Sequence, residues 1–428
     1  MMFEHLFTKG FALQSFYQVL KLKKALKTEE ELTKWQNKNL ARLISQDIDK
    51  VGFYKDKNFR ALEDLPIIDK KIMMDNFADF NCLKMSSDEL RQKLHNHDQP
   101  KNFTIGMSTG TSGNRSLYII SEREKYIWLG TILAKLLPKY PRQGAKIAVA
   151  LPTATPIYQS ANHLWRLQLQ FFNLNDGLEC VADKLAAFAP DTLIAPPHLL
   201  RFLVENGFKL PLKRVFSGAE VLDPCDRKII DEAFGVKCQE IYMASEGLLA
   251  TPCEHGNLHL CEDSMHFECE AVSDDGLVTP IITDFIRNTQ IMARYRMNDV
   301  LRLDERPCPC GSPMRRISEV VGRMDDVFKL RARDGRLVTL TPDIMRNSIL
   351  DASKQIEDFR LIYRKDGAIV ITLPPHIDAQ SLIDLNLAFE GLLDRFNISQ
   401  TFIIEQQVLT PPPKGKLRRI INQHQHHN

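Results

Sequence analysis

Two segments far apart in the chain carry residue types suited to binding phosphate groups. The first is rich in hydroxyl groups and glycine and consists of Ser108, Thr109, Gly110, Thr111, Ser112 and Gly113. Glycine permits backbone angles and close approaches that let several N–H groups point at one anion, as a phosphate-binding loop requires. The second segment, residues 414–419, places Lys416 beside Gly415 in a basic stretch. Together the two segments suggest ATP chemistry.

Three further polar segments lie between these two. Ser217-Gly218-Ala219-Glu220 follows an apolar run at 212–216, and residues 242–246 follow an apolar run at 236–241. Both apolar runs have the length of a strand, and a helical pattern over 224–234 joins them. We therefore expect both polar segments at the carboxyl ends of neighbouring parallel strands, where open α/β sheets bind ligands.

The third polar segment, residues 295–299, ends in an acidic side chain. Asp299 offers two carboxylate oxygens, which can accept hydrogen bonds from both hydroxyl groups of a ribose. A basic and acidic stretch, residues 322–326, follows soon after it. All five segments thus contain side chains suited to a nucleotide.

The elements that must position these residues change in kind along the chain. From residue 146 to about residue 241, strand and helix patterns alternate, which predicts a mostly parallel sheet covered by helices. Nearer the N-terminus, 11–26 has a helical pattern, and Thr28 with Glu31 forms a capping-box pattern at the start of a second helix.

The pattern after Arg323 is that of a compact α+β unit. Apolar runs at 359–364 and 368–373 predict a hairpin, which is followed by a helix at 378–396 and a strand at 401–408. A chain of 428 residues also exceeds what one hydrophobic core usually organises. We therefore predict two domains, which cover residues 1–324 and 325–428.

Composition narrows the class of protein. With 56 basic and 54 acidic residues, the net charge of +2 gives no reason to expect a nucleic-acid partner. No apolar stretch approaches the roughly 20 residues of a membrane span, and the first residues do not form a secretory signal. We expect a cytoplasmic protein with no integral membrane segment. Nine cysteines, an odd number, favour thiols or metal ligands over a disulfide framework.

The five segments, in this order, resemble the adenylate-forming superfamily of acyl-CoA synthetases and adenylation domains. The resemblance covers nearly the whole chain and is strongest to the phenylacetate-CoA ligase-like branch, which includes coenzyme-F-adenylating synthetases. Residues 65–70, Leu-Pro-Ile-Ile-Asp-Lys, support that branch. The resemblance implies an α/β fold, with mostly parallel sheets flanked by helices in a large N-terminal domain and a small, mobile C-terminal α+β lid.

The resemblance also implies roles for individual residues. The loop from Ser108 to Gly113 would hold the β- and γ-phosphates of ATP, and Arg115 would add a cation. Glu246, completed by Ser245 in the family pattern, would hold Mg²⁺. The adenine would be lined by Ser217, Gly218, Ala219 and Glu220, with Tyr242 stacked on its face. Asp299 would bind the ribose, and Arg323 would reach the ribose or the phosphates.

Lys416 is the residue that we assign to catalysis. A compact ammonium can bridge the attacking carboxylate and the α-phosphate and neutralise charge as it develops. The resemblance implies that this lysine enters the site in one orientation of the small domain, which pivots near Asp325. Lys414 is the second candidate, and spacing to the glycine favours Lys416.

Cysteines and histidines form a second constellation. The six candidate ligands are Cys253, His255, His259, Cys261, Cys308 and Cys310. Two thiolates on the tight turn at 308–310 suit one tetrahedral zinc ion with a distant second pair. The resemblance favours Cys253, His259, Cys308 and Cys310, with His255 as the substitute. Such a closed site would be structural, and reduced structural thiols are the alternative.

We expect an enzyme that activates a carboxylic acid as an acyl-adenylate, releases pyrophosphate and passes the acyl group to a thiol, coenzyme A in the first instance. The run at 327–333 contains no glycine, unlike relatives that make thioesters, so an amine, hydroxyl, carrier protein or cofactor acceptor stays open. A catalytically inactive zinc-bearing module that binds nucleotide is the alternative from another class. Tyr158, Phe171 and Phe172 are candidates for the acid pocket, and a homodimer is compatible with the sequence.

Overall fold

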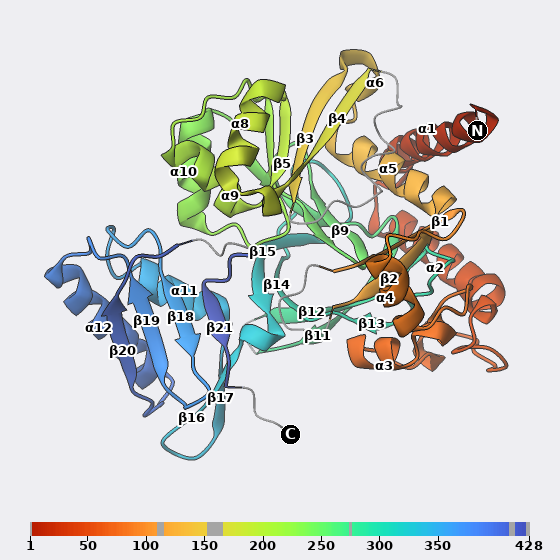
Figure 1. Ribbon diagram of the computed structural model, residues 1–428. Helices are drawn as coiled ribbons and strands as arrows, with labels where there is room; N and C mark the ends of the chain where they lie inside the picture. The colour runs from red at the N-terminus through yellow and green to blue at the C-terminus, as the bar shows by residue number, and fades with distance from the viewer. Residues whose placement is uncertain (1, 109–114, 152–165, 274–275, 411–415, 425–428) are drawn as a thin grey trace.

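The computed structural model describes residues 2–108, 115–151, 166–273, 276–410 and 416–424 (Figure 1). Two large sheets form most of the molecule, and a smaller unit carries the last strands of the chain, blue in Figure 1. The predicted α/β fold with a small C-terminal α+β part is confirmed. The division at residue 325 stays a prediction.

The first large sheet is parallel and five-stranded. Its order is β4 (Leu167–Asn173), β3 (Ala145–Leu151), β5 (Thr192–Ala195), β6 (Arg214–Ser217) and β7 (Cys238–Glu240). The helices between its strands are α8 (Leu178–Phe188), α9 (Pro197–Glu205) and α10 (Pro224–Phe234). The alternating pattern thus predicted this sheet correctly, because each apolar run is buried and each helix has one apolar face.

The second large sheet is antiparallel throughout its described pairs, which the sequence pattern did not predict. Its order is β11 (Met265–Ala271), β12 (Leu277–Asp284), β14 (Asp299–Asp304), β15 (Arg316–Arg323), β10 (Leu258–Leu260), β9 (Gly247–Pro252) and β8 (Tyr242–Ala244), and β13 (Tyr295–Arg296) pairs with β12. The chain crosses from β7 in the parallel sheet to β8 in this sheet. Tyr242 therefore lies past the carboxyl end of the parallel strand β7, as predicted, and it also begins β8 of the second sheet.

Helices and a hairpin from the first part of the chain cover this core. They are α1 (Met2–Ala25), α2 (Glu29–Arg42), α3 (Lys70–Asp75), α4 (Ser87–His95), α5 (Glu122–Leu136), α6 (Tyr140–Gln143) and the antiparallel pair β1 (Phe103–Met107) and β2 (Leu117–Ser121). The side chain of Thr28 accepts the N–H of Glu31 and forms the predicted capping box of α2. Among the described helices, none is both long and apolar enough to cross a bilayer.

The last part of the chain has its own core. Its elements are β16 (Phe328–Arg331), β17 (Leu337–Leu340), α11 (Pro342–Leu350), β18 (Arg360–Tyr363), β19 (Ile369–Leu373), α12 (Ala379–Arg395), β20 (Phe402–Gln406) and β21 (Ile420–Asn422). One buried apolar cluster takes all its members from Phe328 to Ile420. The predicted hairpin, helix and strand are all present. We refer to residues 328–422 as the C-terminal unit and to residues 2–324 as the N-terminal unit.

Close packing of α1 on α5 depends on a glycine. A Cβ atom added at Gly130 would lie 2.1 Å from the carbonyl oxygen of Ala12. Gly130→Ala should therefore push α1 away from α5 and lower the free energy of unfolding by about 1–3 kcal/mol, as overpacking usually does. Urea denaturation measures this change.

Gly391 in α12 is the matched control, because no atom of the described residues lies within 4 Å of a Cβ added there. Gly391→Ala should raise the free energy of unfolding by about 0.5–1 kcal/mol, since alanine restricts the unfolded chain. Equal effects of the two substitutions would show that contact with Ala12 does not limit the packing of α1.

Candidate active site

A cavity of about 730 Å³ lies where the two units meet. Its walls come from the ends of β6, β14 and β15, from β8, and from residues 416–418 of the C-terminal segment. The predicted site residues that line it are Ser108, Ser217, Ala219, Glu220, Tyr242, Ser245, Glu246, Asp299, Arg323, Asp325 and Lys416. Segments that are distant in the sequence therefore converge on one cavity.

The remaining predicted nucleotide-binding residues lie elsewhere. Thr109, Gly110, Thr111, Ser112 and Gly113 fall outside the described residues. Arg115 is exposed, and its guanidinium contacts the sulfur of Met107 at 3.5 Å. Within the part of the chain that the structure describes, neither Arg115 nor Gly218 lines the cavity. The phosphate loop is represented by Ser108, whose hydroxyl accepts the N–H of Ser116 at 2.9 Å.

The part of the cavity wall that was predicted to line the adenine contains a hydroxyl group without a hydrogen-bond partner among the described residues. Ser217 ends β6, is 1% exposed, and its Oγ has no hydrogen-bond partner among the described residues. Ala219 has a φ of +72°, which turns the backbone sharply after β6. A buried polar atom without a partner costs free energy unless a ligand satisfies it. The wall at Ser217 therefore suits a ring that presents hydrogen-bonding edges.

Asp299 lies at the start of β14, opposite Arg323 of β15. The hydroxyl of Tyr242 donates a hydrogen bond to Asp299 Oδ2 at 2.6 Å. Burial raises the pKa of the Asp299 carboxyl, while the Tyr242 hydroxyl and the Arg323 guanidinium act to lower it. One carboxylate oxygen is thus held by the protein, which orients the other toward the cavity.

Glu246 follows β8 and is buried, with 9% of its surface exposed. The hydroxyl of Ser245 donates to its Oε2 at 2.8 Å, and the hydroxyl of Tyr295 donates to its Oε1 at 3.3 Å. Two donors therefore fix a buried carboxylate on the cavity wall. A single oriented carboxylate suits Mg²⁺, which takes its other ligands from phosphate oxygens and water.

Lys416 enters the cavity from the C-terminal segment. Burial lowers the pKa of its ammonium group, and the nearby guanidinium of Arg323 lowers it further. Three carboxylates act in the opposite direction, those of Glu220, Asp299 and Glu246. The ammonium is therefore partly stripped of water and surrounded by the residues that were predicted to hold a nucleotide.

Among the cations that line the cavity, the sequence analysis gave no role to Lys70 or Arg287. Lys70 begins α3, and burial lowers its pKa while Glu246 acts to raise it. Arg287 lines the cavity and donates to the backbone carbonyl of Ser245 at 2.7 Å. Lys70 ends the motif at 65–70, which supported the family resemblance but was not linked to a role for the lysine. Arg287 stands in a segment with no recognisable motif.

The cavity also has an apolar region, lined by Tyr118, Ile120, Trp128, Leu248 and Met265. Neither Phe171 nor Phe172, the candidates for the acid pocket, lines this cavity, and both pack into the core, as aromatic residues more often do. Adjacent side chains on a strand point to opposite faces of the sheet, and these two pack into different buried clusters. Tyr158 falls outside the described residues.

A separate cluster brings together Cys253, His259, Cys308 and Cys310, whose candidate ligand atoms all lie within 4.8 Å of one another. The Sγ atoms of Cys253 and Cys308 are 3.7 Å apart, and Cys310 Sγ lies 3.5 Å from His259 Nε2. His259 Nδ1 lies 2.8 Å from the carbonyl oxygen of Met314. An Nδ1–H that donates to this carbonyl leaves the Nε2 lone pair directed at the thiols.

The cluster joins two connections of the antiparallel sheet. Cys253 follows β9 and His259 lies in β10, whereas both other cysteines lie between β14 and β15. His255 is exposed and is not one of the four clustered residues. Of the two histidines that the sequence left open, the fold thus brings His259 to the cysteines.

Comparison with known proteins agrees with this geometry. No family model matches the chain. Phenylacetate-coenzyme A ligase of Thermus thermophilus is 23% identical over 374 residues, which cover 79% of this chain and 80% of that protein. The phenylacetate-coenzyme A ligase of Pseudomonas putida is 22% identical over 350 residues, which cover 76% and 74%. These two similarities support the predicted resemblance to the adenylate-forming superfamily and to its phenylacetate-CoA ligase-like branch.

Solved structures share the fold of this chain. The crystal structure of 2-hydroxyisobutyryl-CoA ligase in the postadenylation state superposes with a TM-score of 0.71 at 17% identity, covering 94% of this chain and 92% of that chain. The same ligase gives 0.61 in an open conformation and 0.53 in the thioesterification state. The arrangement of the present chain is therefore more similar to the postadenylation state than to the other two.

Asp299 should make the free energy of unfolding depend on pH. Its folded-state pKa lies above the ordinary value of 3.8, so the native state retains the proton more tightly than the unfolded state. Stability from this group must then fall as pH rises from about 3.8 through the raised pKa. Asp299→Asn cannot ionise, so it should gain stability relative to the parent protein across this window, as urea denaturation at several pH values would measure.

Asp304 is a control of opposite sign. The hydrogen bond from Arg306 lowers the pKa of Asp304 to about 2, so this group stabilises the fold above pH 3.8 and loses that effect as pH falls toward 2. Asp304→Asn should therefore lose stability at neutral pH. A free energy of unfolding of Asp299→Asn that is below that of the parent protein at neutral pH, by a margin that grows with pH, would show that ionised Asp299 does not destabilise the fold.

Proposed function

We propose that this protein is an ATP-dependent acid–thiol ligase. It activates a carboxylic acid as an acyl-adenylate with release of pyrophosphate and then transfers the acyl group to coenzyme A. The observation that carries the proposal is the placement of Lys416 in the same cavity as Asp299 and Glu246. A cation from one unit and two oriented carboxylates from the other match the charge that must be handled at a triphosphate.

In this proposal the N-terminal unit holds the nucleotide. Asp299 accepts the ribose hydroxyl groups with the oxygen that Tyr242 leaves free. The unsatisfied hydroxyl of Ser217 bonds an edge of the adenine, which packs against the backbone at Ala219. Ser108 begins the loop that holds the β- and γ-phosphates. Glu246 holds Mg²⁺, which would neutralise phosphate charge.

Lys416 acts where the two reactants meet. The carboxylate of the substrate attacks the α-phosphorus, a bond from oxygen to phosphorus forms, and the bond to the β-phosphate oxygen breaks to release pyrophosphate. Negative charge builds on the phosphoryl oxygens during this step, and a positioned ammonium stabilises it without reorganisation of solvent. The apolar region near Trp128 and Met265 would receive the organic part of the acid.

The relatives support the two halves of the reaction. Two of them are phenylacetate-coenzyme A ligases. The 2-hydroxyisobutyryl-CoA ligase has been crystallised with acyl-AMP compounds and with CoA. Coenzyme A is thus the acceptor that the comparisons favour over an amine, a hydroxyl or a carrier protein.

A hinge at Asp325 would let Lys416 leave the cavity between the two steps. Asp325 is exposed and lies in the 3-10 turn η7 (Met324–Asp326), which joins β15 to β16. The side-chain amide of Asn298 donates to Asp325 Oδ2 at 2.7 Å. Rotation of the C-terminal unit would change the backbone angles of this turn, whose last residue, Asp326, is buried and paired with Arg418 of that unit.

The function is tested by a screen of aryl and aliphatic acids for ATP-dependent pyrophosphate release, followed by addition of coenzyme A. Pyrophosphate release with an acid and formation of its CoA thioester are the expected results. Release of pyrophosphate without consumption of coenzyme A would show that the acyl group is transferred to a different acceptor. Binding of ATP without release by any acid would leave an inactive nucleotide-binding module.

Lys416→Ala should reduce pyrophosphate release by about 100-fold or more, the range seen when one donor to a developing oxyanion is removed. ATP binding should stay within about threefold of the parent protein, because other residues grip the nucleotide in the ground state. Calorimetry and a pyrophosphate assay measure the two effects. Lys414→Ala is the control and should retain activity; loss in Lys414→Ala with none in Lys416→Ala would reverse the assignment.

We also propose that the cluster of Cys253, His259, Cys308 and Cys310 holds one structural zinc ion. A tetrahedral ion with Zn–S bonds of about 2.3 Å places two sulfurs about 3.8 Å apart and a sulfur about 3.6 Å from a nitrogen. The separations of 3.7 and 3.5 Å agree with these values. All four positions would be filled by protein, so the ion would clamp two loops and take no part in the chemistry.

Protein purified without chelator should contain about one zinc ion per chain by elemental analysis. Cys310→Ser should lose most of that zinc and unfold at a lower temperature, because the remaining three ligands no longer close the site. Cys82→Ser changes an exposed cysteine outside the cluster and should keep both zinc and stability. Full zinc content in Cys310→Ser would exclude this ligand set.

A further inference from the structure

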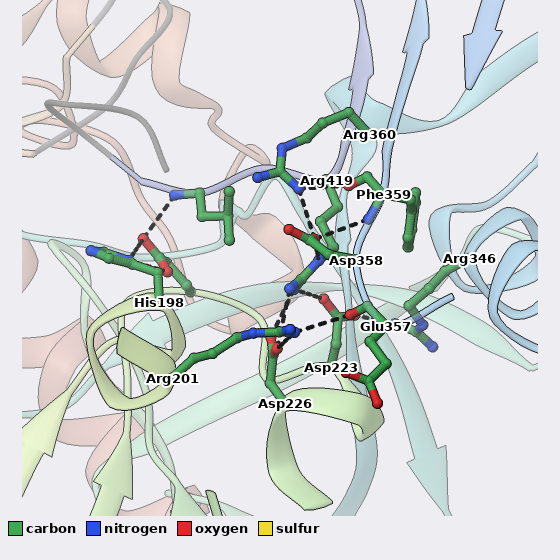
Figure 2. A network of polar contacts seen from close by, with 12 residues as sticks. His198, Arg201, Asp223, Asp226, Arg346, Glu357, Asp358, Phe359, Arg360 and Arg419 are labelled. Carbon is green, nitrogen blue, oxygen red and sulfur yellow. Dashed lines mark hydrogen bonds and ion pairs between the residues drawn. The ribbon is translucent and has the colours of Figure 1, made fainter. Parts of the chain in front are cut away.

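A cluster of charged side chains lies between the two units (Figure 2). Its centre is Arg419, which follows Lys416 by three residues and is only 8% exposed. Its guanidinium donates to Asp226 at 2.8 and 3.1 Å and also to Asp223, both in the N-terminal unit. Through Nε it donates to Asp358 of the C-terminal unit at 2.8 Å. We call these four residues the Arg419 cluster.

Further bonds cross the same interface beside the cluster. Arg201 of α9 donates to Asp226 at 3.0 Å and to the backbone carbonyl of Glu357 at 3.0 Å. Arg346 of α11 donates to Glu319 of β15. Figure 2 shows Arg201 and Arg346 on either side of the aspartates of α10. Each unit thus supplies arginines to acceptors of the other.

The two aspartates explain why the cluster forms here. Asp223 is the N-cap residue of α10, and Asp226 lies in its first turn, where the helix dipole favours negative charge. They are 6% and 1% exposed. Buried carboxylates are costly unless they are paired and hydrogen-bonded. With the C-terminal unit in this orientation, Arg419 supplies that pairing from across the interface.

The backbone beside Lys416 is anchored in the same way. The N–H of Leu417 donates to Glu220 Oε1 at 2.8 Å, and Glu220 is itself held by His198 Nδ1 at 2.8 Å. Leu417 and Arg419 thus fix the segment that immediately follows Lys416. A displacement of Arg419 would be passed to Lys416 through only two intervening residues.

We propose that Arg419 is a positioning residue, which holds the C-terminal unit in the orientation that places Lys416 in the cavity. This inference rests on the proposed function, which assigns Lys416 to the adenylation step. Rotation of the C-terminal unit away from α10 takes both Arg419 and Arg346 away from the buried Asp223, while Asp226 keeps its bond to Arg201 alone. The cluster therefore biases the equilibrium between orientations toward the one that adenylates. Weakening it slows adenylation and spares the transfer step.

Hydrogen exchange measured by mass spectrometry tests the anchoring without any substrate. In Arg419→Gln, the peptide that carries the Leu417 amide should exchange about 10-fold faster or more, since a buried charge pair has been broken. Exchange in β19, the centre of the small sheet, should not change. Arg360→Gln is the matched control, because Arg360 donates to Asp358 and to the Phe359 carbonyl within the C-terminal unit.

Half-reaction kinetics test the link to Lys416. With ATP and an acid that passes the screen, Arg419→Gln should lower kcat for pyrophosphate release by about 10- to 100-fold and leave the KM for ATP within about threefold. Consumption of the purified acyl-adenylate with coenzyme A should also stay within about threefold. A merely structural role would slow both half-reactions together.

Unchanged exchange at Leu417 in Arg419→Gln would overturn the proposal, as would equal slowing of both half-reactions. If Arg419→Gln does not fold, Arg201→Gln replaces it, because Arg201 crosses the interface while Asp226 keeps its bond to Arg419. That variant should show the same pattern with a smaller effect. If the parent protein releases no pyrophosphate with any acid, the proposed function fails, and hydrogen exchange alone decides whether Arg419 holds the units together.

Discussion

The cost of burying charge between the two units determines where the last segment of the chain lies. Two aspartates at the start of α10 are buried, and Arg419 of the C-terminal unit bonds to both, in addition to the bond that Asp226 accepts from Arg201. An unpaired buried charge costs several kcal/mol, roughly 3–5 when one partner is removed. The orientation that pairs these charges is also the one that brings Lys416 into the cavity. The interactions that stabilise the interface therefore also place the Lys416 ammonium in the cavity.

Charged groups are also buried inside the cavity, where hydrogen bonds offset part of the cost. Burial raises the pKa of Asp299 and lowers that of Lys416, so both groups carry their charge at a cost to the fold. Hydrogen bonds from Tyr242 to Asp299 and from Ser245 to Glu246 offset part of that cost and fix the carboxylates in place. Such oriented, partly dehydrated charges are useful because they need little reorganisation when a charged ligand arrives.

Local patterns predicted the elements well and the long-range pairing less well. The parallel strands, α10 and the hairpin of the C-terminal unit follow from buried apolar runs and turn residues, which are local signals. The antiparallel sheet did not, because strands such as β9 and β12 are buried along nearly their whole length and lack the alternation typical of antiparallel strands, and because β10 pairs with the distant β15. Tyr242 lies past the end of the parallel strand β7, as expected, and it also begins β8, which was not expected. Phe171 and Phe172, which were candidates for the acid pocket, instead pack into the two cores on either side of one strand.

The central claim is that an acid and ATP form a mixed anhydride with AMP in this cavity, and its most direct measurement is isotope transfer. An acid that supports pyrophosphate release is supplied with ¹⁸O in its carboxylate, and the nucleotide product is analysed by mass spectrometry. The account predicts AMP that carries one ¹⁸O atom, since the attacking oxygen stays with phosphorus when the acyl group leaves. Unlabelled AMP, or ADP with label in inorganic phosphate, would contradict it.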